Sequence, residues 1–172
     1  MTKIIKTLFV ALSILFISCE KESNKKEQGG KEPEKAKVYS VKYSIDFSKD
    51  ISNNGSYTIT YLDKDEKEKQ VELNQDTKLP HIITVDNLTQ DSRYSIKIKF
   101  TQNETLAAAA ENGEYHFKRK YKYFISDGDT TFSGEIGGST ESTTDSPEGA
   151  KLVLQNMSKN ELGAEGSVSD KF

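Results

Sequence analysis

The sequence of 172 residues contains one cysteine, two histidines, three prolines and no tryptophan. A single cysteine cannot form an intramolecular disulfide, so a small domain built from this chain must be stabilised by its hydrophobic core. The histidines, His81 and His116, belong to no zinc-ligand motif, and the chain has no phosphate-binding glycine loop and no nucleophile elbow. The sequence therefore predicts no catalytic residue, no metal site and no cofactor.

Long hydrophobic runs are lacking too. The longest mostly apolar segment, Leu8–Ile17, is too short for a transmembrane helix, which needs about 20 residues. Lys3 and Lys6 precede it, and the small residue Ser18 follows it. A positive start, a short apolar segment and a small residue at its end are typical of a secretory signal.

The first 19 residues resemble the export signals that the lipoprotein signal peptidase cleaves. In that family the cysteine after the cleavage site, here Cys19, accepts a diacylglyceryl group. Phe16 stands where the family usually has leucine, and Leu15 lies one place earlier. The resemblance implies a signal peptide at 1–18, a lipidated Cys19, and a location in the cell envelope, most often at the outer membrane, facing the periplasm or the cell surface. An ordinary signal peptide with an incidental cysteine is the alternative.

Residues 20–37 carry six lysines, five glutamates and a single alanine as their apolar content. Such a segment cannot bury enough surface to offset the entropy of ordering, so we predict a disordered tether over residues 19–37. A flexible chain of this length spans about 25 Å. The membrane, reached through the lipid anchor, is thus the first predicted partner. A net charge of −3 argues against nucleic acid as a partner.

Residues 38–136 alternate apolar and polar side chains with period two, the pattern of half-buried strands. We predict an all-β fold, an antiparallel and immunoglobulin-like β-sandwich of about seven strands, that folds by itself. Residues 104–111 are the one segment in this region for which we predict a helical turn. The predicted strands are Tyr39–Phe47, Tyr57–Tyr61, Lys69–Leu73, Ile82–Val85, Tyr94–Phe100, Tyr115–Ile125 and Thr131–Ile136.

Residues 137–172 form a polar tail of low complexity, rich in glycine, serine, threonine and glutamate. This composition predicts a mostly disordered tail. One segment within it, Lys151–Asn156, is briefly apolar and is compatible with a short helix or with an added strand.

Two resemblances refine the predicted sandwich. Leu88, six residues before Tyr94, resembles the tyrosine corner of fibronectin type III and immunoglobulin-like domains, in which the tyrosine hydroxyl bonds a nearby backbone group. Residues 38–136 are also similar to the MmpS family, small β-sandwich proteins that accompany lipid exporters in mycobacteria. The motifs that carry this second similarity are Tyr57-x-Ile59-x-Tyr61-x-Asp63, Leu79-Pro80 and Ile125-Ser126-Asp127-Gly128.

The MmpS-like pattern has two departures in this chain. His81 replaces the tryptophan that follows Leu-Pro in the family, and the cysteines of the family are missing. The resemblance implies a β-sandwich and an accessory role in export. It assigns no binding residue to this chain.

Five lysines are the candidates for a ligand-binding surface: Lys97 and Lys99 on one predicted strand, and Lys118, Lys120 and Lys122 on another. If the two strands pair, these side chains form a cationic stripe that would suit envelope glycan, lipopolysaccharide phosphate or anionic lipid. Lysines on a solvent-facing strand also discourage edge-to-edge aggregation, so a solvated face is the alternative interpretation.

The sequence favours a membrane-anchored bacterial lipoprotein with a non-catalytic binding or accessory domain. Its partners would be an envelope glycan, an anionic lipid or a protein complex. An accessory subunit of an export system and, less favoured, an envelope hydrolase are the alternatives.

Overall fold

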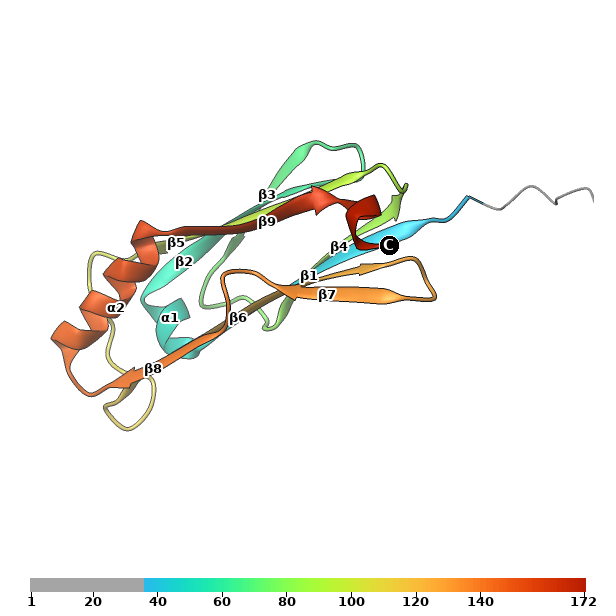
Figure 1. The fold of residues 1–172 in the computed structure, drawn as a ribbon. Coiled ribbons are helices and arrows are strands. Elements are labelled where there is room, and N and C mark those ends of the chain that lie inside the picture. Colours follow the sequence, from blue (N-terminus) through green and yellow to red (C-terminus); the bar gives the residue numbers. More distant parts are fainter. Residues whose placement is uncertain (1–35) are drawn as a thin grey trace, which may run out of the picture. The chain divides into compact units, whose positions relative to one another are not determined.

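The computed structural model describes residues 36–172. The predicted signal peptide, Cys19 and residues 19–35 of the predicted tether lie outside the described residues. Figure 1 shows the arrangement of the elements. In chain order they are β1 (Tyr39–Phe47), α1 (Lys49–Asn53), β2 (Gly55–Leu62), β3 (Glu68–Leu73), β4 (His81–Leu88), β5 (Arg93–Gln102), β6 (Tyr115–Ser126), β7 (Thr131–Glu135), β8 (Thr140–Thr144), α2 (Pro147–Lys159), β9 (Glu161–Ser167) and the 3-10 helix η1 (Val168–Lys171).

The strands form two antiparallel sheets that face each other, which confirms the predicted all-β sandwich. One sheet has the order β4-β1-β6-β7, with β8 also paired to β6, and the other has the order β3-β2-β5-β9. The long strand β6 pairs with β8 over Tyr115–Arg119 and with β7 over Lys122–Ser126. The segment between β7 and β8 turns at Gly137 and Gly138, whose φ angles of 68° and 73° glycine adopts readily.

The core follows from the period-two pattern of the sequence. In β1 every second residue is buried, and the residues between them are half-buried or exposed. Three tyrosines, Tyr43, Tyr57 and Tyr121, are fully buried at the centre. The Tyr121 hydroxyl donates to the Tyr57 hydroxyl at 2.5 Å, and the Tyr43 hydroxyl donates to the Ser95 carbonyl at 3.3 Å. Each bond joins one sheet to the other.

The prediction that residues 137–172 form a disordered tail is wrong. These residues form β8, α2, β9 and η1. Strand β9 pairs with β5 from Arg93 opposite Ser167 to Lys99 opposite Glu161. The apolar segment of the tail lies within a helix, and the structure has nine strands within residues 36–172 instead of about seven. The folded domain therefore continues through η1 and does not end at residue 136.

The tail was missed because its apolar residues are few and stand among many glycine, serine, threonine and glutamate residues. The half-buried side chains of β9 that pack against the core are Leu162 and Ala164. The start of α2 carries a clearer signal, since Ser146 and Pro147 are preferred residues for the N-cap and first position of a helix. The Ser146 hydroxyl accepts a hydrogen bond from the Gly149 amide at 3.2 Å, as this signal predicts.

The predicted helical turn at residues 104–111 is also wrong, because buried side chains hold this segment as a loop. The Asp50 carboxylate accepts the Ala110 amide at 2.7 Å, and the Asn54 side-chain oxygen accepts the Ala107 amide at 2.6 Å. Backbone amides that donate to these side chains do not donate to the backbone carbonyls of a helix. The loop is thereby fixed to α1 and to the residue that follows it.

Helix α2 offers a direct test of the corrected domain. Leu154 is fully buried, whereas Leu152, on the same helix, is 58% exposed. Leu154→Ala should lower the free energy of unfolding by about 2–5 kcal/mol, since it leaves a cavity in the core. Leu152→Ala should change it by less than about 0.5 kcal/mol. Urea unfolding of both variants measures the difference, and equally small effects would show that α2 does not belong to the core.

Candidate functional site

The five lysines of the predicted cationic stripe lie on different sheets. Lys97 and Lys99 are on β5, which pairs with β2 and β9, whereas Lys118, Lys120 and Lys122 are on β6, which pairs with β1, β7 and β8. The two strands do not pair, so the condition for a single cationic stripe is not met. The lysines form two separate groups, one on the outer face of each sheet.

Each lysine of the β6 group has a carboxylate opposite it on a neighbouring strand. Asp46 of β1 is opposite Lys120, and Glu135 of β7 is opposite Lys122. Glu141 of β8 is opposite Lys118, with 3.6 Å between Lys118 Nζ and Glu141 Oε2. Opposite charges that face each other across a sheet stabilise the strand pair. Lys118 thus has an ion pair, while Lys120 and Lys122 have a carboxylate opposite them in the register, so acidic residues offset the positive charge of this face.

The β5 group is also flanked by acidic residues. Lys99 is opposite Glu161 of β9, and Lys97 is opposite Gly163, which lies two residues from both Glu161 and Glu165. On the other side, β2 places only threonines beside these two lysines. Two lysines with adjacent glutamates do not form the extended positive surface that a polyanion requires.

The residues of the predicted tyrosine corner are both buried, but the expected hydrogen bond is not formed. Leu88 ends β4, and Tyr94 lies near the start of β5. The Tyr94 ring stacks on Tyr123 with 5.6 Å between ring centroids, and its hydroxyl lies against Gly166 of β9. Within residues 36–172 the Tyr94 hydroxyl donates to no backbone group. Burial and the neighbouring Tyr123 raise the pKa of Tyr94.

A cavity of about 260 Å³ lies between α2 and the β6–β8 strand pair. Its apolar wall combines α1, β6 and α2, which contribute Ile51, Phe117, Val153 and Met157. Its polar wall is formed by Arg119, Thr140, Ser142, Asn156 and Asn160. We call this cavity the Arg119 pocket.

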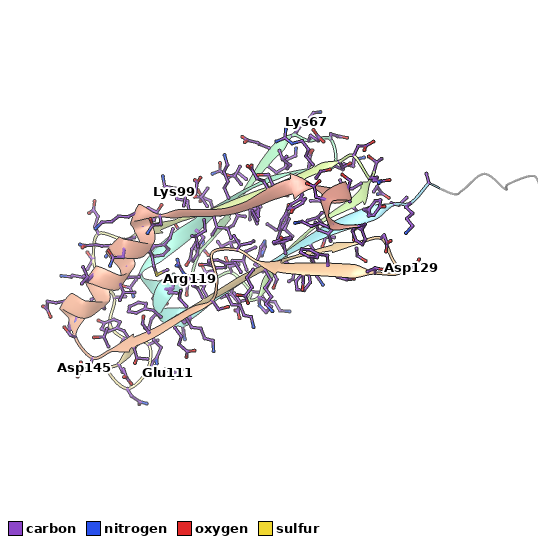
Figure 2. All side chains as sticks on the ribbon, viewed as in Figure 1. Lys67, Lys99, Glu111, Arg119, Asp129 and Asp145 are labelled. Atoms are coloured by element: carbon purple, nitrogen blue, oxygen red, sulfur yellow. The ribbon has the colours of Figure 1, made fainter. Side chains whose placement is uncertain are left out.

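Strand β6 positions Arg119 through the same alternation that builds the core. Phe117 and Tyr121, two residues to either side, are buried, so Arg119 takes an inward position and is half-buried. Figure 2 shows Arg119 between α2 and β6, whereas Lys99 lies at the outer surface of the other sheet. Arg119 Nε donates to the Thr140 hydroxyl at 2.9 Å. Within residues 36–172 no carboxylate lies within 4.0 Å of the guanidinium.

The charge of Arg119 reaches the tyrosine pair at the centre of the core. Burial raises the pKa of Tyr57 to about 12, while the hydroxyl of Tyr121 and the positive charge of Arg119 act in the opposite direction. Burial, with Tyr57 beside it, raises the pKa of Tyr121 further, and Arg119 again opposes this shift. The positive charge in the pocket therefore acts on two side chains of the core.

Sequence reasoning missed Arg119 because it lies in a basic run, Lys118-Arg119-Lys120, that looks uniformly solvent-exposed. The alternation of β6 separates the three, since Lys118 and Lys120 are exposed and Arg119 points inward. The two histidines stand apart from this site. His81 begins β4, and His116 Nε2 lies 3.6 Å from a Glu114 carboxylate oxygen with both side chains about half exposed.

The carboxylates opposite the β6 lysines determine whether these lysines stabilise or destabilise the fold. If the lysines repelled one another, replacing Lys118, Lys120 and Lys122 together by glutamine would stabilise the fold. Because each faces a carboxylate, the triple variant should instead lower the free energy of unfolding, by up to about 0.2–1 kcal/mol per pair. Urea unfolding at low salt measures the change, and higher stability of the variant would contradict the pairing.

A matched control exists on exposed loops. Lys64, Lys67 and Lys78 are exposed and lie on loops, where no neighbouring strand places a carboxylate opposite them. Their replacement by glutamine changes the net charge of the chain equally. This control should alter the free energy of unfolding less than the change on β6 does, so the comparison separates cross-strand pairing from net charge.

Alkaline pH should destabilise the fold. In the unfolded chain Tyr57 ionises near pH 10, whereas in the folded chain it holds its proton to about pH 12. The folded state then binds more protons than the unfolded state, so the free energy of unfolding falls by about 1.4 kcal/mol per pH unit for each such tyrosine. Below pH 10 this stability is fully present. Urea unfolding from pH 10 to pH 12 should give a shallower slope for Tyr57→Phe, and equal slopes would contradict the assignment.

Comparison of the chain with protein-family models, with curated proteins and with solved structures gives no match. Within residues 36–172 no helix is long and apolar enough to cross a bilayer, and no three side chains of the metal-binding types gather as a ligand set. The Arg119 pocket brings apolar side chains, amides and a guanidinium together from α1, β6, β8 and α2.

Proposed function

We propose that this protein is a lipid-anchored protein of the bacterial envelope whose β-sandwich acts by binding rather than by catalysis. The anchor would be Cys19, at the end of the signal-like segment, and the membrane most consistent with it is the outer membrane. The observation that carries the binding role is the Arg119 pocket. It combines an apolar wall with a guanidinium that has no carboxylate partner within residues 36–172.

The position of the pocket supports an anchored binding domain. The chain enters the sandwich at β1, which has nine residues and spans roughly 30 Å at about 3.3 Å per residue. Ile51, which lines the pocket, lies just beyond the far end of this strand. Figure 1 shows α2 at the end of the sandwich opposite to the start of β1. A ligand could therefore reach the pocket without approaching the side at which the chain enters.

The place where the chain enters is itself fixed. Lys37, the last residue of the predicted tether, donates to the Asp127 carboxylate at 2.8 Å. Asp127 lies in the turn between β6 and β7 and also accepts the Thr130 and Asp129 amides. The hydrogen bond from Lys37 and these backbone bonds lower the pKa of Asp127 to about 2. The pair joins the segment before β1 to the sandwich.

The anchor is tested by metabolic labelling with radioactive palmitate. The wild-type chain should be labelled, and Cys19→Ser should remain unlabelled as the larger, uncleaved precursor, because only the thiol accepts the diacylglyceryl group. Ser18→Ala is the matched control, since it keeps a small residue before the cysteine and should be labelled normally. Equal labelling of the wild type and Cys19→Ser would refute the anchor.

A further inference from the structure

The guanidinium of Arg119 has a large unused capacity for hydrogen bonds. Of its five N–H groups, the Nε–H donates to the Thr140 hydroxyl at 2.9 Å, and Arg119 also lowers the pKa of Tyr121 through its charge and a hydrogen bond to the hydroxyl, which leaves the remaining N–H groups free within residues 36–172. No ion pair of residues 36–172 includes Arg119. A half-buried cation without a counter-ion is costly, because burial removes water and nothing of opposite charge replaces it. An anion in the pocket would remove this cost.

The walls of the pocket restrict the kind of anion. Side chains of Ile51, Phe117, Val153 and Met157 form one part of the wall. Ile51, Phe117 and Met157 are buried by the protein itself, so the half-buried Val153 offers most of the apolar surface that a ligand would cover. Asn156 and Asn160 carry amide groups at its polar side, close in sequence on the last turn of α2 and at its C-cap. A purely inorganic anion would use the guanidinium but leave Val153 without an apolar partner.

The size of the pocket sets the scale of the ligand. Its volume is about 260 Å³. It lies just below the range of about 300–1,000 Å³ that is usual for drug-sized ligands. A short organic acid fits this volume, whereas a folded glycan chain or a lipid with two acyl chains does not.

We propose that the Arg119 pocket binds a small organic carboxylate with an apolar body. The carboxylate would accept two parallel hydrogen bonds from the terminal nitrogens of Arg119, the geometry that guanidinium and carboxylate groups favour. The apolar body would lie against Val153 and the edge of Met157. This inference rests on the proposed binding function but not on the anchor, so a failed palmitate experiment leaves it standing.

The test uses the full chain, purified in a non-ionic detergent, and hexanoate as the probe. Titration is followed by the amide NMR signals of residues on α2 and β8, which report on the pocket rather than on the micelle. We expect saturable shifts for the wild type and binding weakened about tenfold or more in Arg119→Gln, because a hydrogen-bonded ion pair is lost. Arg93→Gln is the matched control, since Arg93 is exposed on β5, is absent from the pocket and is the only other arginine of the chain.

A second variant protects the test against misfolding of Arg119→Gln. Asn156 is exposed at the pocket, and its side chain makes no hydrogen bond within residues 36–172, so Asn156→Trp should fold normally while filling the cavity. It should lose hexanoate binding with Arg119 still present. Hexanoate binding by Asn156→Trp at wild-type strength, or no saturable shift in the wild type, would overturn the proposal.

Two further ligands show which part of hexanoate, the charge or the apolar body, is needed for binding. Hexanol has the same apolar body without the charge, and inorganic phosphate has charge without the body. Much weaker binding of both than of hexanoate supports the proposal. Equal binding of hexanol would show a merely apolar cavity, and equal binding of phosphate would show a general anion site, so either result would overturn it.

Discussion

The hydrogen bond between the Tyr57 and Tyr121 hydroxyls is the interaction on which the arrangement of the two sheets depends. Tyr57 belongs to the four-stranded sheet and Tyr121 to the five-stranded one, and both side chains are fully buried. A phenol buried without a partner loses its hydrogen bonds to water, so each ring needs a polar neighbour at a fixed distance. The two tyrosines supply this polar neighbour to each other. Their hydrogen bond sets how closely the two sheets approach. Arg119, two residues from Tyr121, lies beside this bond, which places the pocket next to the most constrained point of the core.

The strands were predictable because their signal is local. Period-two alternation of large residues in β1, β2, β5 and β6 determines which side chains face the core, independently of the rest of the chain. Strand β9 was not predictable in this way, since its only apolar side chains are Leu162 and Ala164 and its other residues are glycine, glutamate and serine. It is a strand because β5 offers it an unpaired edge, which is a property of the assembled sheet and not of the segment. The prediction of a helical turn at residues 104–111 was wrong for a related reason. The groups that hold this loop come from Asp50 and Asn54, far away in the sequence.

The candidate site shows that amino-acid composition does not predict which charged side chains have partners of opposite charge. The sequence places five lysines and two arginines on β5 and β6 without showing which charges are compensated. Cross-strand register decides this: Lys118, Lys120 and Lys122 each face a carboxylate, while Arg119, in the midst of them, faces inward without one. Inward and outward positions of β6 could have been assigned from Phe117 and Tyr121. The carboxylates could not, because strand order and register come from the whole fold.

The position of β1 has a mechanical consequence. This strand lies between β4 and β6 and is hydrogen-bonded on both sides. A force applied at Lys37 along the strand would load both ladders in shear, so that many hydrogen bonds share the strain at once, after the Lys37–Asp127 ion pair has yielded. Pulling on an edge strand from its end would instead peel bonds one after another. The domain is thus joined to the preceding segment by a strand that resists tension, which suits a protein held by one point of attachment.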